Sequence, residues 1–90
     1  MAKNNSYWVY LLLCKNGSIY TGITDDVEKR FMLHKDGRGA RYTRAFGAVK
    51  ILYTEKKRSK GNALKREYEI KKLSAREKWE LVNGESNGKT

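Results

Sequence analysis

Residues 7–22 constrain the fold of this chain more than any other segment, because they have the pattern of a β-hairpin. Two runs rich in aromatic and β-branched residues flank the dipeptide Asn16-Gly17, and Asn-Gly between such runs is a strong hairpin signal. A two-residue loop at this dipeptide would place Tyr10 and Tyr20 on opposite faces of the hairpin. A three-residue loop, with the glycine left-handed, would pair Leu12 with Tyr20 and place both tyrosines on one face.

The hydrophobic pattern favours the three-residue loop, because a shift of one residue in register moves every side chain to the opposite face. In that register, one face gathers five apolar side chains, from Val9, Leu11, Leu13, Ile19 and Ile23. The other face carries Trp8, Tyr10, Leu12, Cys14, Tyr20 and Gly22. We therefore predict a hairpin with one strongly apolar face and a second face that holds two tyrosines.

The rest of the chain predicts three helices and a third strand. A helix over about 26–35 ends at the Asp-Gly that follows it, and residues 47–55 alternate between apolar and polar as a strand does. A second helix is expected over about 60–73, and residues 74–77 have the spacing of a capping box that opens a third. The order β-β-α-β-α-α predicts a small α/β (α+β) domain, in which helices pack on a three-stranded, mainly antiparallel sheet.

The charge balance favours a polyanionic partner. Twenty Lys and Arg residues oppose ten Asp and Glu residues, which gives a net charge of +10, and nucleic acid is the commonest partner of so basic a surface. No segment has the length of a membrane span or the form of a signal peptide, so we expect no membrane partner and a cytoplasmic location. Ninety residues predict one domain, at 7–83, with flexible ends at 1–6 and 84–90.

Two basic segments are candidates for contact with that partner. Residues 37–44 combine two glycines, three arginines and a tyrosine; glycines let a backbone approach a ligand, and arginines offer forked donors to phosphate. A flexible, solvated loop is the alternative, and we favour phosphate contact. A second basic segment, 56–60, follows the third predicted strand. The nucleic-acid-binding residues predicted from both segments are Arg38, Arg41, Tyr42, Arg44, Lys57, Arg58 and Lys60.

Glu67 occupies an unusual position in the second predicted helix. Ala63, Glu67 and Ile70 share one helical face, the face that should pack on the sheet. An ionised carboxylate there is costly unless it is paired or binds a cation. Glu67 therefore lies at the edge of the apolar stripe, forms a structural ion pair with Arg30, or binds a hard divalent ion such as Mg²⁺ that faces the hairpin tyrosines.

Several of these residues occur in a recognisable order: Trp8-Val9-Tyr10, Tyr20-Thr21-Gly22, Arg30 with His34 four positions later, and Glu67. This order resembles the GIY-YIG nuclease superfamily, and the chain looks closest to its small stand-alone members of the UPF0213 type. The resemblance covers the chain from residue 7 to about residue 82. It departs from the family at two points. Ile23 stands where some members carry Lys or Ser, and Asn83 is not a secure counterpart of the family's terminal asparagine.

The resemblance implies metal-dependent hydrolysis of phosphodiester bonds. We expect the substrate to be DNA, with RNA as the other possibility, and recognition to depend on structure more than on sequence, because 90 residues leave no room for a separate targeting domain. Glu67 would hold one Mg²⁺ or Mn²⁺, and Arg30 would neutralise charge on the phosphoryl oxygens. Tyr10 would help to activate the attacking water, while Tyr20 and His34 would orient water or phosphate and assist proton transfer. A nucleic-acid-binding module on the same fold, with weak or no catalysis, is the main alternative. A basic protein that docks on another protein is a weaker one.

Overall fold

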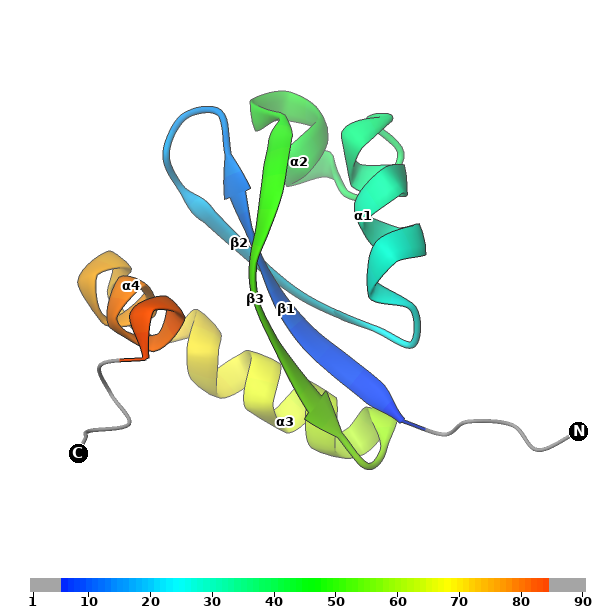
Figure 1. The fold of residues 1–90 in the computed structure, drawn as a ribbon, viewed down its shortest axis with the longest axis vertical. Helices are drawn as coiled ribbons and strands as arrows, with labels where there is room; N and C mark the ends of the chain where they lie inside the picture. Colours follow the sequence, from blue (N-terminus) through cyan, green and yellow to red (C-terminus); the bar gives the residue numbers. More distant parts are fainter. Residues whose placement is uncertain (1–5, 85–90) are drawn as a thin grey trace, which may run out of the picture.

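The computed structural model describes residues 6–84, and Figure 1 shows helices on both sides of a small sheet. The sheet has the strand order β2-β1-β3 and comprises β1 (Tyr7–Cys14), β2 (Ile19–Thr24) and β3 (Ala48–Lys57). One face is covered by α1 (Val27–Lys35) and α2 (Arg41–Phe46), and the other by α3 (Lys60–Lys71) and α4 (Ala75–Asn83). The predicted fold class is confirmed. The flexible ends predicted at 1–6 and 84–90 lie outside the described residues, except for Ser6 and Gly84.

The hairpin has the predicted three-residue register. Leu12 pairs with Tyr20, and Tyr10 pairs with Gly22. Gly17 has a φ of +88°, a left-handed conformation that glycine adopts without steric cost. The Asn16 side chain accepts hydrogen bonds from the backbone and the hydroxyl of Ser18, which stabilises the turn. Tyr10 and Tyr20 therefore share one face of the sheet.

Both faces of the hairpin are buried. The face that carries Tyr10 and Tyr20, called the tyrosine face below, is therefore also a packing surface. Beneath α3 and α4, Val9 and Leu11 of β1 are fully buried against Ala63, Ile70 and Leu81. On the opposite face, Tyr10, Leu12 and Ala48 form a second buried cluster. Tyr20, Phe31 and Ile51 are partly buried and pack against it. The side chains that carry the chemistry of the tyrosine face are thus held by close packing.

The helix boundaries follow local capping signals, with one exception. Asp26, Ser59 and Ser74 each accept a hydrogen bond from a backbone N–H at the start of α1, α3 and α4, and the capping box at residues 74–77 is complete. The predicted order is confirmed, with one addition: α2 forms where the sequence predicted a loop. Ala40 at its N-cap provides no side-chain acceptor, so no local signal marks the start of α2. No helix within residues 6–84 is long and apolar enough to cross a membrane.

Candidate active site

A chain of buried hydrogen bonds joins three elements on the tyrosine face. The Tyr10 hydroxyl of β1 lies 2.8 Å from His34 Nε2 of α1, and His34 Nδ1 lies 2.6 Å from Thr43 Oγ1 of α2. Each of these three residues is only 1% exposed. Thr43 was not among the predicted site residues, because its role depends on a helix that the sequence did not indicate.

We assign the donor and acceptor roles in this chain of hydrogen bonds from its last member, Thr43. The Thr43 hydroxyl donates to the Ala40 carbonyl at 3.2 Å, so its oxygen is free to accept from His34 Nδ1–H. His34 Nε2 then carries no proton and accepts the hydrogen bond from Tyr10. Burial, aided by the nearby Arg30 charge, lowers the pKa of His34 from 6.5 to about 4, and burial raises the pKa of Tyr10 to about 12. At neutral pH, both groups are therefore uncharged.

Two glycines make room for this chain of hydrogen bonds. A Cβ on Gly22 would stand 2.6 Å from the Tyr10 hydroxyl oxygen, and a Cβ on Gly39 would overlap His34 Nδ1. No carbon atom tolerates such distances, so any larger residue at either position would displace the ring beside it. The sequence suggested that Gly39 lets the backbone approach a ligand; in the structure, the group that it approaches is His34.

We expect Gly39→Ala to lower the free energy of unfolding by about 1–3 kcal/mol, because the added methyl group overpacks a buried ring. Urea denaturation measures this loss. Gly61→Ala is the matched control, since a Cβ at that helical position meets nothing closer than 3.9 Å; it should leave the protein as stable or up to about 1 kcal/mol more stable. Equal stability of Gly39→Ala and the wild type would contradict the packing described for His34.

The pKa of His34 also predicts a pH dependence of stability. The pKa of His34 is about 4 in the folded protein, against an ordinary value of 6.5 for a histidine in the unfolded chain. Between these two pH values the unfolded chain therefore binds more protons than the folded protein does. Stability is therefore complete above pH 6.5 and falls as the pH decreases toward 4. From pH 7 to pH 5 we expect a loss of about 2 kcal/mol in the free energy of unfolding, measured by urea denaturation. His34→Gln removes the single histidine and should remove this slope; a wild type equally stable at both pH values would refute the prediction.

Tyr20 and Arg30 complete the group of side chains on this face. The Tyr20 ring centroid lies 6.2 Å from that of Tyr10 and 5.1 Å from that of His34, and Tyr20 is partly exposed. Arg30 Nη2 donates to the Gly39 carbonyl at 2.8 Å, and hydrogen bonding from the Arg30 side chain lowers the pKa of Tyr10 against the larger effect of burial. The structure thus brings together all four residues predicted to be catalytic.

Glu67 reaches this region from the other side of the sheet. It lies on α3, its side chain is 16% exposed, and its Oε2 is 3.2 Å from Lys71 Nζ. Within residues 6–84, Lys71 is therefore its ion-pair partner, and Arg30 is not. The Glu67 charge still contributes to the raised pKa of Tyr10, which indicates that the two side chains are near one another.

A pocket at the open edge of β2 shows how α3 approaches the tyrosines. Lys71 lines this pocket of about 310 Å³ together with Tyr20 and Tyr42. Because β2 is an edge strand, a side chain on α3 can reach the tyrosine face around that edge. Glu67, one helical turn before Lys71, is accordingly placed next to the site but is not inside the hydrogen-bonded chain.

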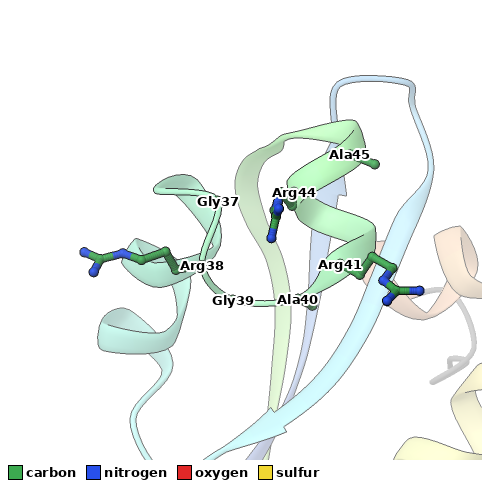
Figure 2. Close-up of a pocket in the computed structure, with 7 residues that line it drawn as sticks. All are labelled: Gly37, Arg38, Gly39, Ala40, Arg41, Arg44 and Ala45. Atoms are coloured by element: carbon green, nitrogen blue, oxygen red, sulfur yellow. The ribbon is translucent and has the colours of Figure 1, made fainter.

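The predicted nucleic-acid contacts fall into two separate regions. Figure 2 shows Arg38, Arg41 and Arg44 around a pocket of about 570 Å³, with Arg38 and Arg41 directed to opposite sides and Arg44 between them. Tyr42 lies on α2 beside these arginines. The second region, at the end of β3 and the start of α3, is at the opposite end of the sheet from α2 (Figure 1).

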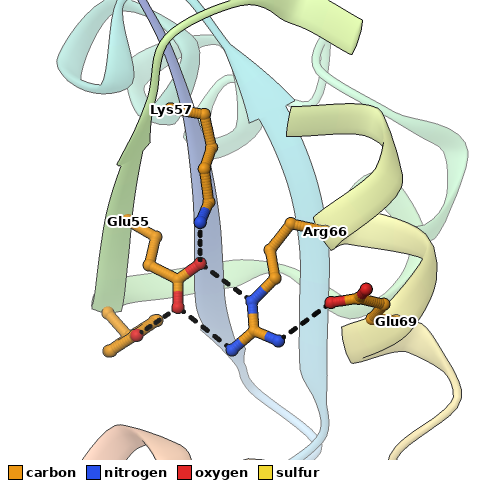
Figure 3. A network of polar contacts seen from close by, with 5 residues as sticks. Glu55, Lys57, Arg66 and Glu69 are labelled. Atoms are coloured by element: carbon orange, nitrogen blue, oxygen red, sulfur yellow. Dashed lines mark hydrogen bonds and ion pairs between the residues drawn. The ribbon is translucent and has the colours of Figure 1, made fainter. Parts of the chain in front are cut away.

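The second region contains a network of ion pairs. Figure 3 shows Glu55 of β3 between Lys57 and Arg66, with Arg66 also bound to Glu69. Lys57 Nζ is 3.4 Å from Glu55 Oε1, and Arg66 Nε is 2.9 Å from the same atom. Lys57 is therefore engaged within the protein, whereas Arg58 and Lys60 are exposed. Contact of these three residues with nucleic acid stays a prediction.

Comparison with known proteins identifies the family to which this chain belongs. The family model described as the GIY-YIG catalytic domain matches residues 6–80. A UPF0213 protein of Staphylococcus saprophyticus is 43% identical over 79 residues, which cover 88% of this chain and 96% of the relative. A UPF0213 protein of Clostridium perfringens is 47% identical over 79 residues, which cover 88% of this chain and 85% of the relative.

Two solved structures have the same fold. The solution NMR structure of a UPF0213 protein from Bacillus halodurans has a TM-score of 0.57 at 44% identity, covering 91% of this chain and 87% of that one. The solution NMR structure of a protein from E. faecalis has a TM-score of 0.60 at 32% identity, covering 100% of this chain and 97% of that one. This chain therefore belongs to the GIY-YIG family of nuclease-like domains, among its small members of the UPF0213 type.

Proposed function

We propose that this protein is a metal-dependent endonuclease that hydrolyses phosphodiester bonds of DNA. The observation that carries the proposal is the buried chain from Tyr10 through His34 to Thr43, set beside Arg30. Hydrolysis of a phosphodiester requires that a proton leave the attacking water and that negative charge on phosphorus be stabilised. The chain of hydrogen bonds supports the first requirement and the guanidinium supports the second.

Glu67 is the carboxylate that would bind a divalent ion, and substrate and water would supply most of the other ligands. Within the described part of the chain, no three His, Cys, Asp or Glu residues gather as a metal cage. Mg²⁺ is often held by one or two carboxylates, with waters and substrate phosphates completing its shell. Glu67 would hold one Mg²⁺ or Mn²⁺ in this way once Lys71 has moved from its carboxylate. When bound, the ion supplies a Lewis acid at the phosphoryl oxygen and lowers the pKa of a coordinated water.

Tyr10 and His34 act as a concerted proton relay in this proposal. The Tyr10 oxygen takes a proton from the attacking water, and the proton of its own hydroxyl passes to His34 Nε2, whose Nδ1–H stays bonded to Thr43. Because the pKa of Tyr10 is about 12 and that of His34 about 4, transfer of the proton from Tyr10 to His34 as a separate step would cost a free energy on the order of 10 kcal/mol. The two transfers therefore have to accompany attack on phosphorus, and no tyrosinate forms beforehand.

Arg30 and Tyr20 are the groups that meet the phosphate. Arg30 donates to the Gly39 carbonyl and hydrogen-bonds the Tyr10 hydroxyl, which fixes the guanidinium, and its other N–H groups are left for phosphoryl oxygens. Tyr20 is partly exposed, whereas Tyr10 is 1% exposed. Substrate binding therefore has to open a path for water to the Tyr10 oxygen, and Tyr20 is the neighbouring ring that can move.

A binding module without catalysis is the second candidate, and two observations favour it. Lys71 already neutralises the Glu67 carboxylate at 3.2 Å, and the Tyr10 hydroxyl is buried with a pKa of about 12. Both features would suit a site that binds phosphate and does not cleave. The basic residues on α2 serve either function.

Cleavage assays separate the two candidates. Labelled duplex, nicked, branched and single-stranded DNA would be incubated with the purified protein in Mg²⁺, in Mn²⁺ and in EDTA, and binding to each DNA would be measured in parallel. We expect cleavage of at least one DNA in the presence of either ion and none in EDTA. Binding to every DNA with cleavage of none would favour the binding module and overturn the endonuclease.

A further inference from the structure

We propose that α2 presents an aromatic platform on which an unpaired base stacks beside the scissile phosphate. The substrate would then carry a single-stranded segment next to the cleavage point. The position of that phosphate rests on the proposed function, whereas the platform itself rests on the geometry of α2. Its rings are those of Tyr42 and Phe46, and they continue outward from the buried tyrosines.

The rings form a continuous series from the core to the surface. The ring centroids of Tyr20 and Tyr42 are 6.0 Å apart with the planes inclined by only 25°, and those of Tyr42 and Phe46 are 4.8 Å apart. Tyr42 is 38% exposed and Phe46 is 42% exposed. The Tyr42 hydroxyl donates to Ser18 Oγ in the hairpin loop. The platform is therefore held in place by the hairpin, and its outer ring is open to a ligand.

Positive charge lies on the same helix as this platform and in the pocket beside Tyr42, which Lys71 and Lys78 also line. Arg41 and Arg44 lie on α2 itself, and Arg38 lies in the segment before it; together they line a pocket that contains no acidic residue. Arg38 has an exposed ion pair with Asp36 at 3.5 Å, whereas Arg41 and Arg44 form no ion pair with any carboxylate of residues 6–84. The cationic side chains on α2 and in the pocket beside Tyr42 offer contacts for phosphate, and the exposed rings offer one for a base; a nucleotide requires both.

An exposed ring discriminates between paired and unpaired DNA. In a duplex, each base is covered on both sides by its neighbours, so it offers no face to a protein ring, and phosphate contacts alone would suffice for binding. An unpaired base has a free face, and stacking of that face on an aromatic side chain strengthens binding by roughly 10-fold per base. The rings on α2 therefore indicate a substrate with unpaired nucleotides.

The chain contains a matched control on the other side of the sheet. Tyr68 of α3 is 65% exposed, and Lys72 Nζ lies 4.8 Å from its ring centroid. It is an exposed aromatic residue beside a positive charge, yet it belongs to a helix that covers the opposite face of the sheet (Figure 1). Loss of this ring should not affect an unpaired base held at α2.

The test uses a DNA duplex with a short single-stranded extension, whose first unpaired nucleotide is 2-aminopurine, and a blunt duplex of the same sequence. Affinity and fluorescence would be measured in EDTA, so that no cleavage is needed. We expect the wild type to prefer the extended DNA and to quench the 2-aminopurine. Phe46→Leu should weaken binding to the extended DNA roughly 10-fold and restore fluorescence, whereas Phe46→Trp and Tyr68→Leu should behave as the wild type.

Equal affinity of the wild type for the two DNAs, or equal losses in Phe46→Leu and Tyr68→Leu, would overturn the platform. The test is independent of hydrolysis. Cleavage of blunt duplex with no preference for the extension would keep the endonuclease and remove the platform. Preference for the extension without cleavage in Mg²⁺ would keep the platform and remove the endonuclease.

Discussion

Tyr10→Phe is expected to lower the cleavage rate at least about 100-fold, because it removes the hydroxyl that passes a proton from water to His34. The variant should fold, since the ring stays and the change removes only the hydrogen bonds of the hydroxyl, the one of 2.8 Å to His34 Nε2 and the one with Arg30. That loss leaves a buried acceptor unpaired, which costs about 1–3 kcal/mol of stability. Single-turnover cleavage and urea denaturation, measured on the same preparation, separate the two effects.

Tyr53→Phe is the control for the tyrosine substitution. Like Tyr10, Tyr53 lies on a strand and its hydroxyl donates to a side chain, here Glu55 at 2.6 Å, although Tyr53 is only partly buried. It packs on the α3 face of the sheet, away from His34. Tyr53→Phe should therefore cleave at the wild-type rate. If Tyr10→Phe cleaved within a few-fold of the wild type, the proton relay would be wrong even if the protein proved to be a nuclease.

The second large effect is expected from Glu67→Gln. Removing the carboxylate removes the acidic ligand that we propose for the divalent ion, so Mg²⁺-dependent cleavage should fall at least about 100-fold. Stability should change by about 1 kcal/mol or less, because Gln keeps the size of the largely buried Glu67 side chain and the partner in the lost ion pair, Lys71, is half exposed. Isothermal titration of Mn²⁺ in the presence of uncleavable DNA provides a readout that does not depend on catalysis.

Glu69→Gln is the matched control on the same helix. Glu69 also forms an ion pair within α3, with Arg66 at 3.1 Å, but it belongs to the network beside β3. It should bind Mn²⁺ and cleave DNA as the wild type does. Equal losses in both variants would assign the effect to general electrostatics on α3, and full activity of Glu67→Gln would exclude Glu67 as the metal ligand.

The parts of the fold that could be predicted are those specified by neighbouring residues. The hairpin register follows from one Asn-Gly turn and from the alternation of apolar side chains, and the capping serines mark the starts of α3 and α4. The short helix α2 has no such signal. It is held by contacts between distant segments, among them hydrogen bonds from Lys15 N–H of the hairpin loop to the carbonyls of Phe46 and Gly47.

The same distinction applies to the site. The four-residue spacing of Arg30 and His34 was enough to place both on one side of α1. Glu67 and Lys71 have the same i,i+4 spacing, which is that of neighbouring side chains on a helix. The partner of His34 could not be found in this way. Thr43 lies nine positions further along the chain, on the helix that was not predicted. Gly39 matters for the site because the folded chain places its backbone in contact with the His34 imidazole.

Cleavage of a branched DNA in H₂¹⁸O tests the central claim most directly, because hydrolysis transfers one oxygen from water to the phosphate of the product. The wild-type protein would be incubated with the DNA under single-turnover conditions, with Mg²⁺ and with EDTA, and the product ends analysed by mass spectrometry. The proposed chemistry predicts one ¹⁸O atom on the terminal phosphate and product only when Mg²⁺ is present. The absence of product with Mg²⁺, a product that lacks ¹⁸O, or a product formed equally in EDTA would contradict it.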